Sequence, residues 1–365
     1  MNADFIEALE AIEKEKGIAK DILIEAIEAA LISGYKRNFN SAQNVRVDIN
    51  RFTGQIRVFA RKTVVEEVFD TRLEISLEAA QEIDPNFRLD DIVEIEVTPR
   101  DFGRIAAQTA KQVVTQRIRE AERGLIYSQF IEREDDIVTG VIQRQDARFY
   151  YIDLGKAEAV MPLTEKMPTD EFNPQDRIKA YIIKVEKTTK GPQIIVSRTH
   201  PGLLKRLFEL EVPEIYDGTV EIKSVAREAG DRSKIAVHSV NPEVDPVGAC
   251  VGPKGLRVQT IVNELKGEKI DIVRWSEDPA EYVANALSPS KVLHVEVNAA
   301  DKVTRVIVPD YQLSLAIGKR GQNARLAAKL TGWKIDIKSE SQAEQEGIQY
   351  PKLSETEEIM GVEQE

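Results

Sequence analysis

Two short segments of the chain combine glycine with basic residues in a way that suits an anionic ligand. They are Gly252-Pro253-Lys254-Gly255 and Gly318-Lys319-Arg320-Gly321. Glycine has no side chain to block a close approach, and turns that expose backbone amides attract anions. Arg257 and Arg325 follow the two segments and add positive charge. Each segment is therefore predicted to hold the phosphodiester backbone of a nucleic acid.

The two segments belong to an internal repeat. At nearly the same distance behind each of them, the chain has Gly-Glu-Lys-Ile-Asp-Ile (267–272) and Gly-Trp-Lys-Ile-Asp-Ile (332–337). Strand-like sequence precedes each segment, and an apolar helix pattern lies on either side of it. The repeat resembles the KH module, whose G-x-x-G loop clamps about four nucleotides of single-stranded backbone. We expect two tandem KH domains of the prokaryotic type, at 201–276 and 277–340.

The expected RNA contacts in these domains come from the loops and from the helices behind them. They are Gly252, Pro253, Lys254, Gly255, Arg257, Gly318, Lys319, Arg320, Gly321, Asn323 and Arg325. A single G-x-x-G arises often at helix ends, so the prediction depends on its recurrence in matching context. Neither copy has the glycine spacing of a P-loop or of a dinucleotide-binding loop, so no nucleotide cofactor is expected.

Residues 126–200 have the strand pattern of a small barrel. Five short segments with strand-like sequence are separated by turns, at 137–143, 149–153, 158–162, 177–185 and 193–197. Five strands in so short a stretch favour the OB-fold, which is the commonest five-stranded small barrel. This part of the chain is therefore predicted to be an OB-fold RNA-binding barrel.

One predicted strand of this barrel has three consecutive aromatic residues. In Phe149-Tyr150-Tyr151, neighbouring rings point to opposite sides of the strand, so at least one ring must face outward. An outward ring beside cations would form a stacking platform for single-stranded bases. We predict RNA contacts at Phe149, Arg198 and His200, with Tyr181 on a strand beside the aromatic one.

Residues 1–125 are expected to form an α+β head. Helix patterns cover 5–12 and the stretch from Asp21, a candidate N-cap, to Gly34. Alternating residues around Thr53-Gly54 predict a β-hairpin, and 91–97 predicts a further strand. A helix capped by Asp101 then continues past Arg119 toward Phe130 and serves as a long connector.

The composition of the 365-residue chain excludes several kinds of site. There is one cysteine, Cys250, so an internal disulfide is impossible. The three histidines, His200, His238 and His294, are too scattered to form a zinc cluster. No hydrolase or metalloprotease motif is present, so we expect no catalytic residue, no metal and no cofactor. No apolar run is long enough to span a bilayer, which favours a cytoplasmic protein without a membrane partner.

The negative charge is concentrated at the C-terminus. The net charge is -12, and residues 340–365 contain eight glutamates against a single basic residue, Lys352. Residues 341–365 are therefore expected to be a short disordered acidic tail. The rest of the chain is nearly neutral, which leaves room for a basic face and for nucleic acid as a partner.

Four longer segments resemble signatures of the NusA family of bacterial transcription elongation factors. They are Asp-Phe-Gly-Arg-Ile-Ala-Ala-Gln-Thr-Ala-Lys-Gln-Val (101–113), Arg-Glu-Ala-Glu-Arg (119–123), Val-Asp-Pro-Val-Gly-Ala-Cys-Val-Gly (244–252) and Gln-Leu-Ser-Leu-Ala-Ile-Gly-Lys (312–319). Together with the order of head, barrel and KH pair, the resemblance covers residues 1 to about 340. Some family members carry further acidic repeat domains, whereas this sequence has only the short acidic tail after that point.

The resemblance implies a factor that is not an enzyme. It would bind RNA polymerase with its head near the RNA exit channel and bind nascent single-stranded RNA with its barrel and KH domains. It would modulate pausing, intrinsic termination and antitermination, and further antitermination factors stay open as partners. On this basis the basic residues of the head are candidates for contact with polymerase or with an RNA hairpin; they are Lys36, Arg37, Arg104 and Lys111.

Two alternatives use the same modules. A KH- and OB-containing exoribonuclease is one, although the head is too short for a duplicated phosphorolytic core. A ribosome-associated RNA-binding factor is the other.

Overall fold

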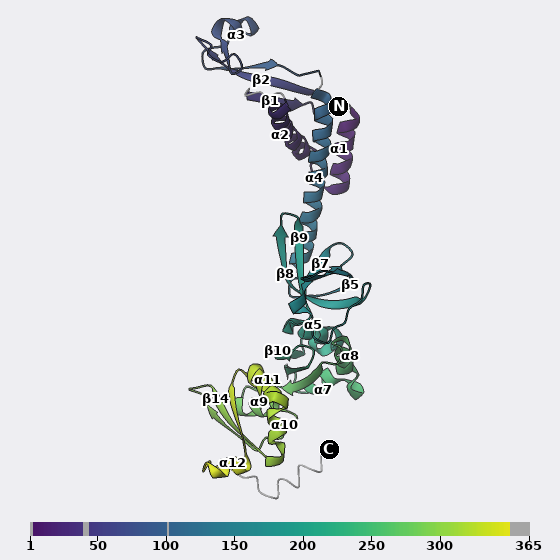
Figure 1. Ribbon diagram of the computed structural model, residues 1–365, viewed down its shortest axis with the longest axis vertical. Helices are drawn as coiled ribbons and strands as arrows, with labels where there is room; N and C mark the ends of the chain where they lie inside the picture. Colours follow the sequence, from purple (N-terminus) through teal and green to yellow (C-terminus); the bar gives the residue numbers. More distant parts are fainter. Residues whose placement is uncertain (1–2, 39–43, 101, 351–365) are drawn as a thin grey trace. The chain divides into compact units, whose positions relative to one another are not determined.

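The computed structural model describes residues 3–38, 44–100 and 102–350. The chain divides into two units, Met1–Ile126 and Tyr127–Glu365, which are described separately below (Figure 1). Asp101, the expected cap, and the final 15 residues of the expected tail, 351–365, lie outside the described residues. Among the helices described, none has both the length and the apolar character that crossing a bilayer requires.

The first unit is an α+β head, as expected from the sequence. Its helices are α1 (Ala3–Lys16), α2 (Lys20–Asn38), α3 (Leu77–Ile83) and the first part of α4 (Phe102–Ile131). Its strands are β1 (Asn44–Ile49), β2 (Ile56–Val65), β3 (Glu74–Ser76) and β4 (Ile92–Glu96). β1 and β4 pair antiparallel with β2, and β3 pairs parallel with it. The predicted hairpin is confirmed, with Val47 opposite Val58 and Gly54 in the left-handed region at φ 67°.

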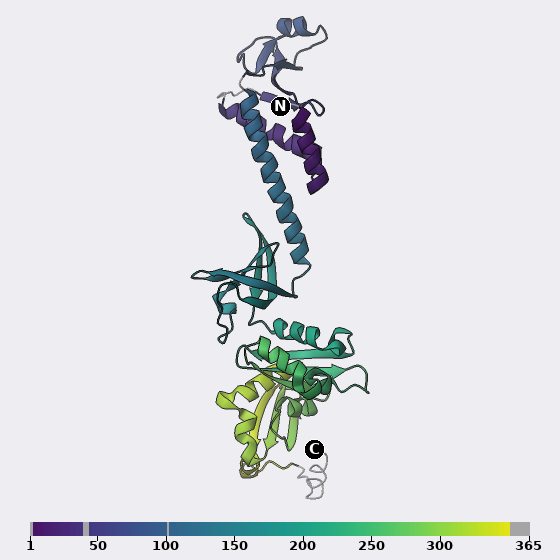
Figure 2. The same ribbon diagram turned by 90° about the vertical axis from the view of Figure 1, so that its right-hand side faces the viewer.

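The main core of the head joins α2 to the start of α4. Leu23, Ile27 and Leu31 on α2 are fully buried together with Phe102 and Ala106 on α4. The alternation of buried and exposed residues on β1 places its apolar side chains against the same core. α4 continues for 30 residues, which confirms the long connector helix (Figure 2).

Two details of the head differ from the expectation. α2 begins before Asp21, so Asp21 is not its N-cap, and it continues through Gly34 to Asn38. A glycine inside a helix lowers its stability by only about 1 kcal/mol relative to alanine. The next residue, Tyr35, is buried and stabilises the turn that contains Gly34. The short α3, whose start is capped by the Ser76 hydroxyl, was not expected.

The second unit begins with a closed five-stranded barrel in the order β5-β6-β7-β9-β8. Its strands are β5 (Ile137–Gln145), β6 (Phe149–Asp153), β7 (Glu158–Pro162), β8 (Arg177–Thr188) and β9 (Gly191–Ser197). All of them lie where the strand pattern predicted them. At Gly140 the barrel wall leaves no room for a side chain, because an added Cβ would lie 2.5 Å from Ile152 and 2.8 Å from the carbonyl oxygen of Asp153.

Two modules of the same topology follow the barrel. The elements of the first are α5 (Pro201–Glu211), α6 (Pro213–Tyr216), β10 (Val220–Glu228), β11 (Arg232–Ser239), α7 (Pro246–Val251), α8 (Leu256–Glu264) and β12 (Lys269–Arg274). Those of the second are α9 (Pro279–Ala286), β13 (His294–Asn298), β14 (Val303–Val308), α10 (Leu313–Ile317), α11 (Gln322–Thr331) and β15 (Lys334–Ser339). In each sheet the first two strands are antiparallel and the last two are parallel. The predicted repeat is thus a repeat of structure.

The folded chain extends beyond residue 340, where the acidic tail was expected to begin. α12 (Glu340–Gln345) starts with a capping box between Ser339 and Gln342, and Ala343 is fully buried. The ring of Tyr350 stacks on His294 at 6.2 Å between centroids. The glutamate-rich composition of this segment led to a prediction of disorder, but its first residues form a short helix with one buried face.

Candidate nucleic-acid interface

The two glycine loops have the same backbone conformation. The first glycine has φ and ψ of 72° and 174° at Gly252, and of 77° and 170° at Gly318. The third residue lies in the left-handed region, at 52° and 27° in Lys254 and at 56° and 28° in Arg320. The structural repeat therefore pairs Lys254 with Arg320. Both side chains are exposed, so each loop presents a basic side chain at the same backbone position.

Each loop lies between the end of one helix and the start of the next. The amide of Gly252 donates to the carbonyl of Gly248 and closes α7, and Gly318 does the same with Ser314 at the end of α10. α8 and α11 begin directly after the loops. Their first amides and the positive end of the helix dipole add to the charge of the basic side chains. This combination is suited to holding a phosphate chain.

The first glycine of the second loop cannot carry a side chain without a change in the backbone. A Cβ at Gly318 would lie 2.7 Å from the backbone nitrogen of Asn323, whereas a Cβ at Gly321 would meet nothing within 4 Å. We expect Gly318→Ala to destabilise the protein by about 3 kcal/mol, and Gly321→Ala by about 1 kcal/mol for its left-handed conformation alone. Thermal melting of the two variants measures the difference, and equal losses would contradict this account of the loop.

Asn323 supports the second loop from inside the protein. Its side chain is 2 % exposed, and Nδ2 donates to the carbonyls of Leu287 and Ala316, each at 3.0 Å. The amide therefore holds the loop to the neighbouring chain, and contact with RNA is incompatible with its burial. This corrects the RNA-binding role that the sequence predicted for Asn323.

Arg257 and Arg325 are ion-paired in the structure. Arg257 donates to the carbonyl of Ala249 at 2.6 Å and to Glu214 at 2.9 Å. Arg325 donates from Nε to Glu228 of the first module at 2.7 Å and is half exposed. Both arginines thus brace the elements around the loops. Their contact with RNA stays a prediction. Because a glutamate partly neutralises each of them, they would attract phosphate less than Lys254, Lys319 and Arg320 do.

The outer face of the barrel carries two aromatic rings. Phe149 and Tyr151 lie on one side of β6, with ring centroids 6.5 Å apart, and Tyr150 points into the barrel against Phe172. The guanidinium of Arg144 lies 3.4 Å from the centroid of the Tyr151 ring. The inference that one ring must face outward is confirmed. Sequence reasoning missed Tyr151 and Arg144, although the alternation that exposes Phe149 also exposes Tyr151.

Tyr181 does not belong to this face. β8, which carries it, pairs with β5 and β9 and not with β6. The Tyr181 ring is 6 % exposed, and its hydroxyl donates to Asp135 at 2.8 Å. Burial and the neighbouring carboxylate raise the pKa of Tyr181 to about 12. It is a structural residue at the junction between the barrel and α5.

Arg198 lies at the centre of the junction between the barrel and the first KH module. Its side chain is 1 % exposed, and its guanidinium pairs with the fully buried Asp170 through hydrogen bonds of 2.8 and 3.1 Å. It also donates to the carbonyl of Lys179 at 2.6 Å, and to the carbonyl and carboxylate of Glu264 at 3.0 and 3.4 Å. No part of the guanidinium is left for RNA. The predicted RNA contact of Arg198 is therefore corrected to a structural role.

His200 lies beside this junction but remains exposed. Its Nδ1 accepts a hydrogen bond from the amide of Gly202 at 3.1 Å and caps α5. One face of the ring stacks on Tyr181 at 4.6 Å between centroids. A capping role for His200 is thus part of the fold, and its contact with RNA stays a prediction.

Buried polar contacts join the two KH modules. The fully buried Lys234 donates from Nζ to Asp271 at 2.9 Å and to the carbonyl of Ser288 at 2.7 Å. Burial lowers the pKa of Lys234, and Asp271 partly opposes this effect. Ser224 and Tyr282 both donate to the carbonyl of Leu330, at 2.8 and 3.0 Å. The two glycine loops are therefore carried by one continuous body.

The predicted basic residues of the head are all exposed. Lys36 and Arg37 lie in the last turn of α2. Arg104 and Lys111 lie on α4 seven residues apart, which places them on one side of the helix. Within the described part of the chain, none of the four forms an ion pair. Their charges are available to a partner of the head.

The structure offers no metal site and no reactive thiol among the residues it describes. Among residues 3–38, 44–100 and 102–350, no group of three or more metal-ligating side chains could hold an ion. Cys250 is buried, and burial raises the pKa of its thiol to about 12, so it stays protonated and unreactive.

A head, a closed five-stranded barrel and two G-x-x-G modules in one chain define a modular RNA-binding factor, and family models agree. The NusA N-terminal domain matches residues 4–124 and the S1 RNA binding domain matches 132–197. The NusA-like first KH domain matches 198–275, and the NusA-like second KH domain matches 279–345.

Whole-chain relatives carry the assignment further. The protein named transcription termination/antitermination protein NusA of Halalkalibacterium halodurans is 79% identical over 348 residues, which are 95% of this chain and 91% of that one. Its namesake from Bacillus subtilis is 73% identical over 365 residues, 100% of this chain and 98% of that one. The solution structure of the B. subtilis NusA N-terminal domain is 73% identical, covers 34% of this chain and 99% of its own, and has a TM-score of 0.31. The chain belongs to the NusA family of transcription factors.

This family consists of transcription factors with RNA-binding domains and not of enzymes. The exoribonuclease and ribosome-factor alternatives are set aside on that ground.

Proposed function

We propose that this protein binds RNA polymerase through its head and nascent single-stranded RNA through its barrel and KH modules. In this role it modulates pausing, intrinsic termination and antitermination in the bacterial cytoplasm. The observation that carries the RNA part is the identical conformation of two basic glycine loops on one body. The relatives' shared name supports the role in transcription.

The proposed RNA contacts follow the exposed cations and rings. Lys254, Lys319 and Arg320 are exposed and form no ion pair with any other described residue, so they supply the phosphate contacts. Phe149 offers a partly exposed ring for a base, next to Tyr151. His200 lies at the barrel end of the same unit.

A single RNA strand is expected to engage several of these contacts. The barrel is joined to the first module by Arg198. The first module is joined to the second by the bonds of Lys234 to Ser288 and of Ser224 to Leu330. Because these modules do not tumble independently, binding at one loop raises the effective concentration of RNA at the next. The affinity for a long strand should therefore exceed that of either loop alone.

The head is proposed to contact polymerase and a nascent RNA hairpin. The protein is expected to lengthen the pause. We expect the double variant Arg104→Ala and Lys111→Ala to reduce this increase several-fold, because two exposed positive charges on one side of α4 are lost. The measurement is single-round transcription on a template with a hairpin-stabilised pause. RNA affinity measured in the absence of polymerase should be unchanged.

A matched control removes two other exposed charges of the head, with Lys14→Ala and Arg88→Ala. This variant should prolong the pause as the wild type does. Full prolongation by the α4 variant would contradict the hairpin contact. Failure of the wild-type protein to co-purify with polymerase would contradict the proposed function as a whole.

A further inference from the structure

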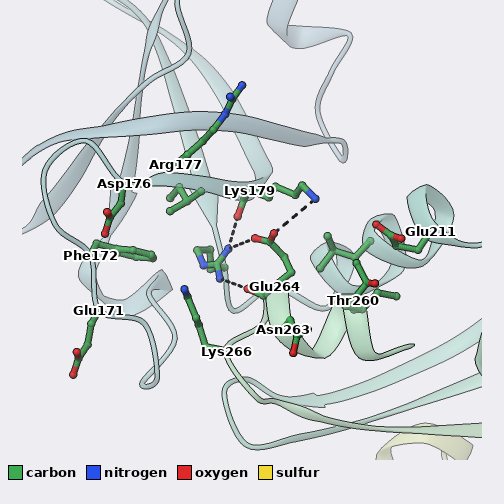
Figure 3. Close-up of a pocket in the computed structure, with 14 residues that line it drawn as sticks. Glu171, Phe172, Asp176, Arg177, Lys179, Glu211, Thr260, Asn263, Glu264 and Lys266 are labelled. Carbon is green, nitrogen blue, oxygen red and sulfur yellow. Dashed lines mark hydrogen bonds and ion pairs between the residues drawn. The ribbon is translucent and has the colours of Figure 1, made fainter. Parts of the chain in front are cut away.

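A cavity of about 480 Å³ lies between the barrel and the first KH module (Figure 3). Its lining includes no residue of either glycine loop. Phe172 and Lys179 of the barrel line it on one side, and Thr260, Glu264 and Lys266 line it on the other. The buried Arg198 also borders it. A cavity of this size is within the range of small-ligand sites.

Three side chains of the cavity have complementary chemistry. The Phe172 ring is partly exposed and is held edge-on by Tyr150, with centroids 5.5 Å apart. The Arg198 guanidinium lies over the ring, 5.7 Å from its centroid, so the opposite face is the one offered to a base. Lys266 is exposed, and no other described residue pairs with it; in Figure 3 its side chain points into the cavity toward Phe172. The Glu264 carboxylate is 26% exposed, and its contacts to Arg198 and Lys179 are long, at 3.4 and 3.7 Å. An aromatic face, a cation and a partly satisfied carboxylate therefore meet in one place.

Helix α8 connects this cavity to the first glycine loop. It begins directly after Gly255 and ends at Glu264, a rise of about 14 Å for nine residues. Its exposed residues carry no charge; they are Leu256, Gln259, Thr260 and Asn263. A phosphate chain leaving the loop along this face would meet no carboxylate of α8 before Glu264, and Glu211 of α5 lies beside Thr260 at the cavity.

We propose that the cavity is a subsite for one nucleotide of the RNA strand that occupies the first glycine loop. The inference rests on the proposed function and adds a contact to it. The base stacks on Phe172, an amino group of its edge donates to Glu264, and a phosphate pairs with Lys266. Mixed charge is expected of such a subsite, since a base presents donors while the backbone presents anions. Three further acids line the cavity, Glu171, Asp176 and Glu211, and of these Glu171 points away from it in Figure 3.

The test uses the full chain with Phe172→Leu and Lys266→Gln, and two unstructured RNAs. One RNA is short and fills only the first loop, at about four nucleotides, and the other is long enough to reach the cavity. Phe172→Leu should weaken binding of the long RNA about tenfold, and Lys266→Gln should lower the slope of log affinity against log salt by about 0.7. Neither variant should change the affinity for the short RNA. Lys205→Gln, which removes an exposed lysine of α5 outside the cavity, is the matched control and should bind as the wild type does.

A second readout places the nucleotide directly. A long RNA carrying 4-thiouridine should crosslink to peptides containing Phe172 or Lys266, and Phe172→Leu should abolish these crosslinks. Because Lys266 is exposed, its variant keeps the proposal testable even if Phe172→Leu lowers the melting temperature.

The outcomes separate the subsite from the function on which it rests. Unchanged affinities of both variants for the long RNA, together with a loss of binding in Lys254→Asp, would overturn the subsite alone. If Lys254→Asp also bound with full strength, the proposed function of the loops would fail with it.

Discussion

Replacing Lys254 with aspartate, or Lys319 and Arg320 together, is expected to remove most of the RNA affinity of the module that carries the change. These three side chains are exposed and unpaired within the described residues, so their charge is free for phosphate. Each lost contact should lower the slope of log affinity against log salt by about 0.7, and the new carboxylate adds repulsion. The fold should survive, because the flanking helices hold each loop through buried residues such as Cys250 and Ala316.

The measurement is a salt titration of RNA affinity, paired with a thermal melt of each variant. Lys269→Asp is the matched control for Lys254→Asp, and Lys269→Asp with Lys334→Asp is the control for the double variant. The charge changes are equal, and these lysines are exposed at equivalent positions of the repeat, at the starts of β12 and β15. Polymerase binding through the head should be unaffected. Full affinity with an unaltered salt slope in both loop variants would mean that the glycine loops are ordinary helix turns.

Arg198→Ala is expected to cause a large loss of stability, of about 3–5 kcal/mol. The change would leave the Asp170 carboxylate, which is fully buried, without its cation, and would break the link to Glu264 of the first KH module. The melting of the second unit should therefore shift to lower temperature. Affinity for a long RNA should fall as well, because the barrel and the KH modules would no longer be held in a fixed orientation.

The partner of Arg198 provides the decisive control. Arg198→Met combined with Asp170→Leu removes both charges, so it should recover much of the stability that the single variant loses. Lys184→Ala, which breaks an exposed pair with Glu186, should leave the melting temperature nearly unchanged. A single Arg198→Ala variant that melts as the wild type does would refute the structural role assigned to this arginine.

The parts of the fold that could be predicted are those that local patterns determine. Period-two alternation located the barrel strands, and the recurrence of one glycine loop located both KH modules. The outward position of Phe149 followed from the alternation of side chains along β6. The patterns that indicated the strands and the outward ring lay within a few residues of each feature, whereas the KH modules were located by comparing two similar segments.

Roles that depend on distant partners could not be predicted. Arg198 follows directly after a strand pattern and stands two residues before His200, and its partners Asp170 and Glu264 are 28 and 66 residues away. Asn323 has the position of a residue that follows a loop, but its acceptors include Leu287, on another element. Burial of a polar side chain is a property of the assembled modules, which explains why both residues were assigned to RNA.

The left-handed conformation at Lys254 and Arg320 means that the proposed phosphate contacts come at a cost in stability. Glycine or asparagine would occupy these positions at lower conformational cost, yet the chain has a long basic side chain at both. Selection for thermal stability alone would favour replacing these residues, and the gain in stability would come with a loss of positive charge. Both loops thus carry a basic residue at the same left-handed position, at a conformational cost that glycine would avoid.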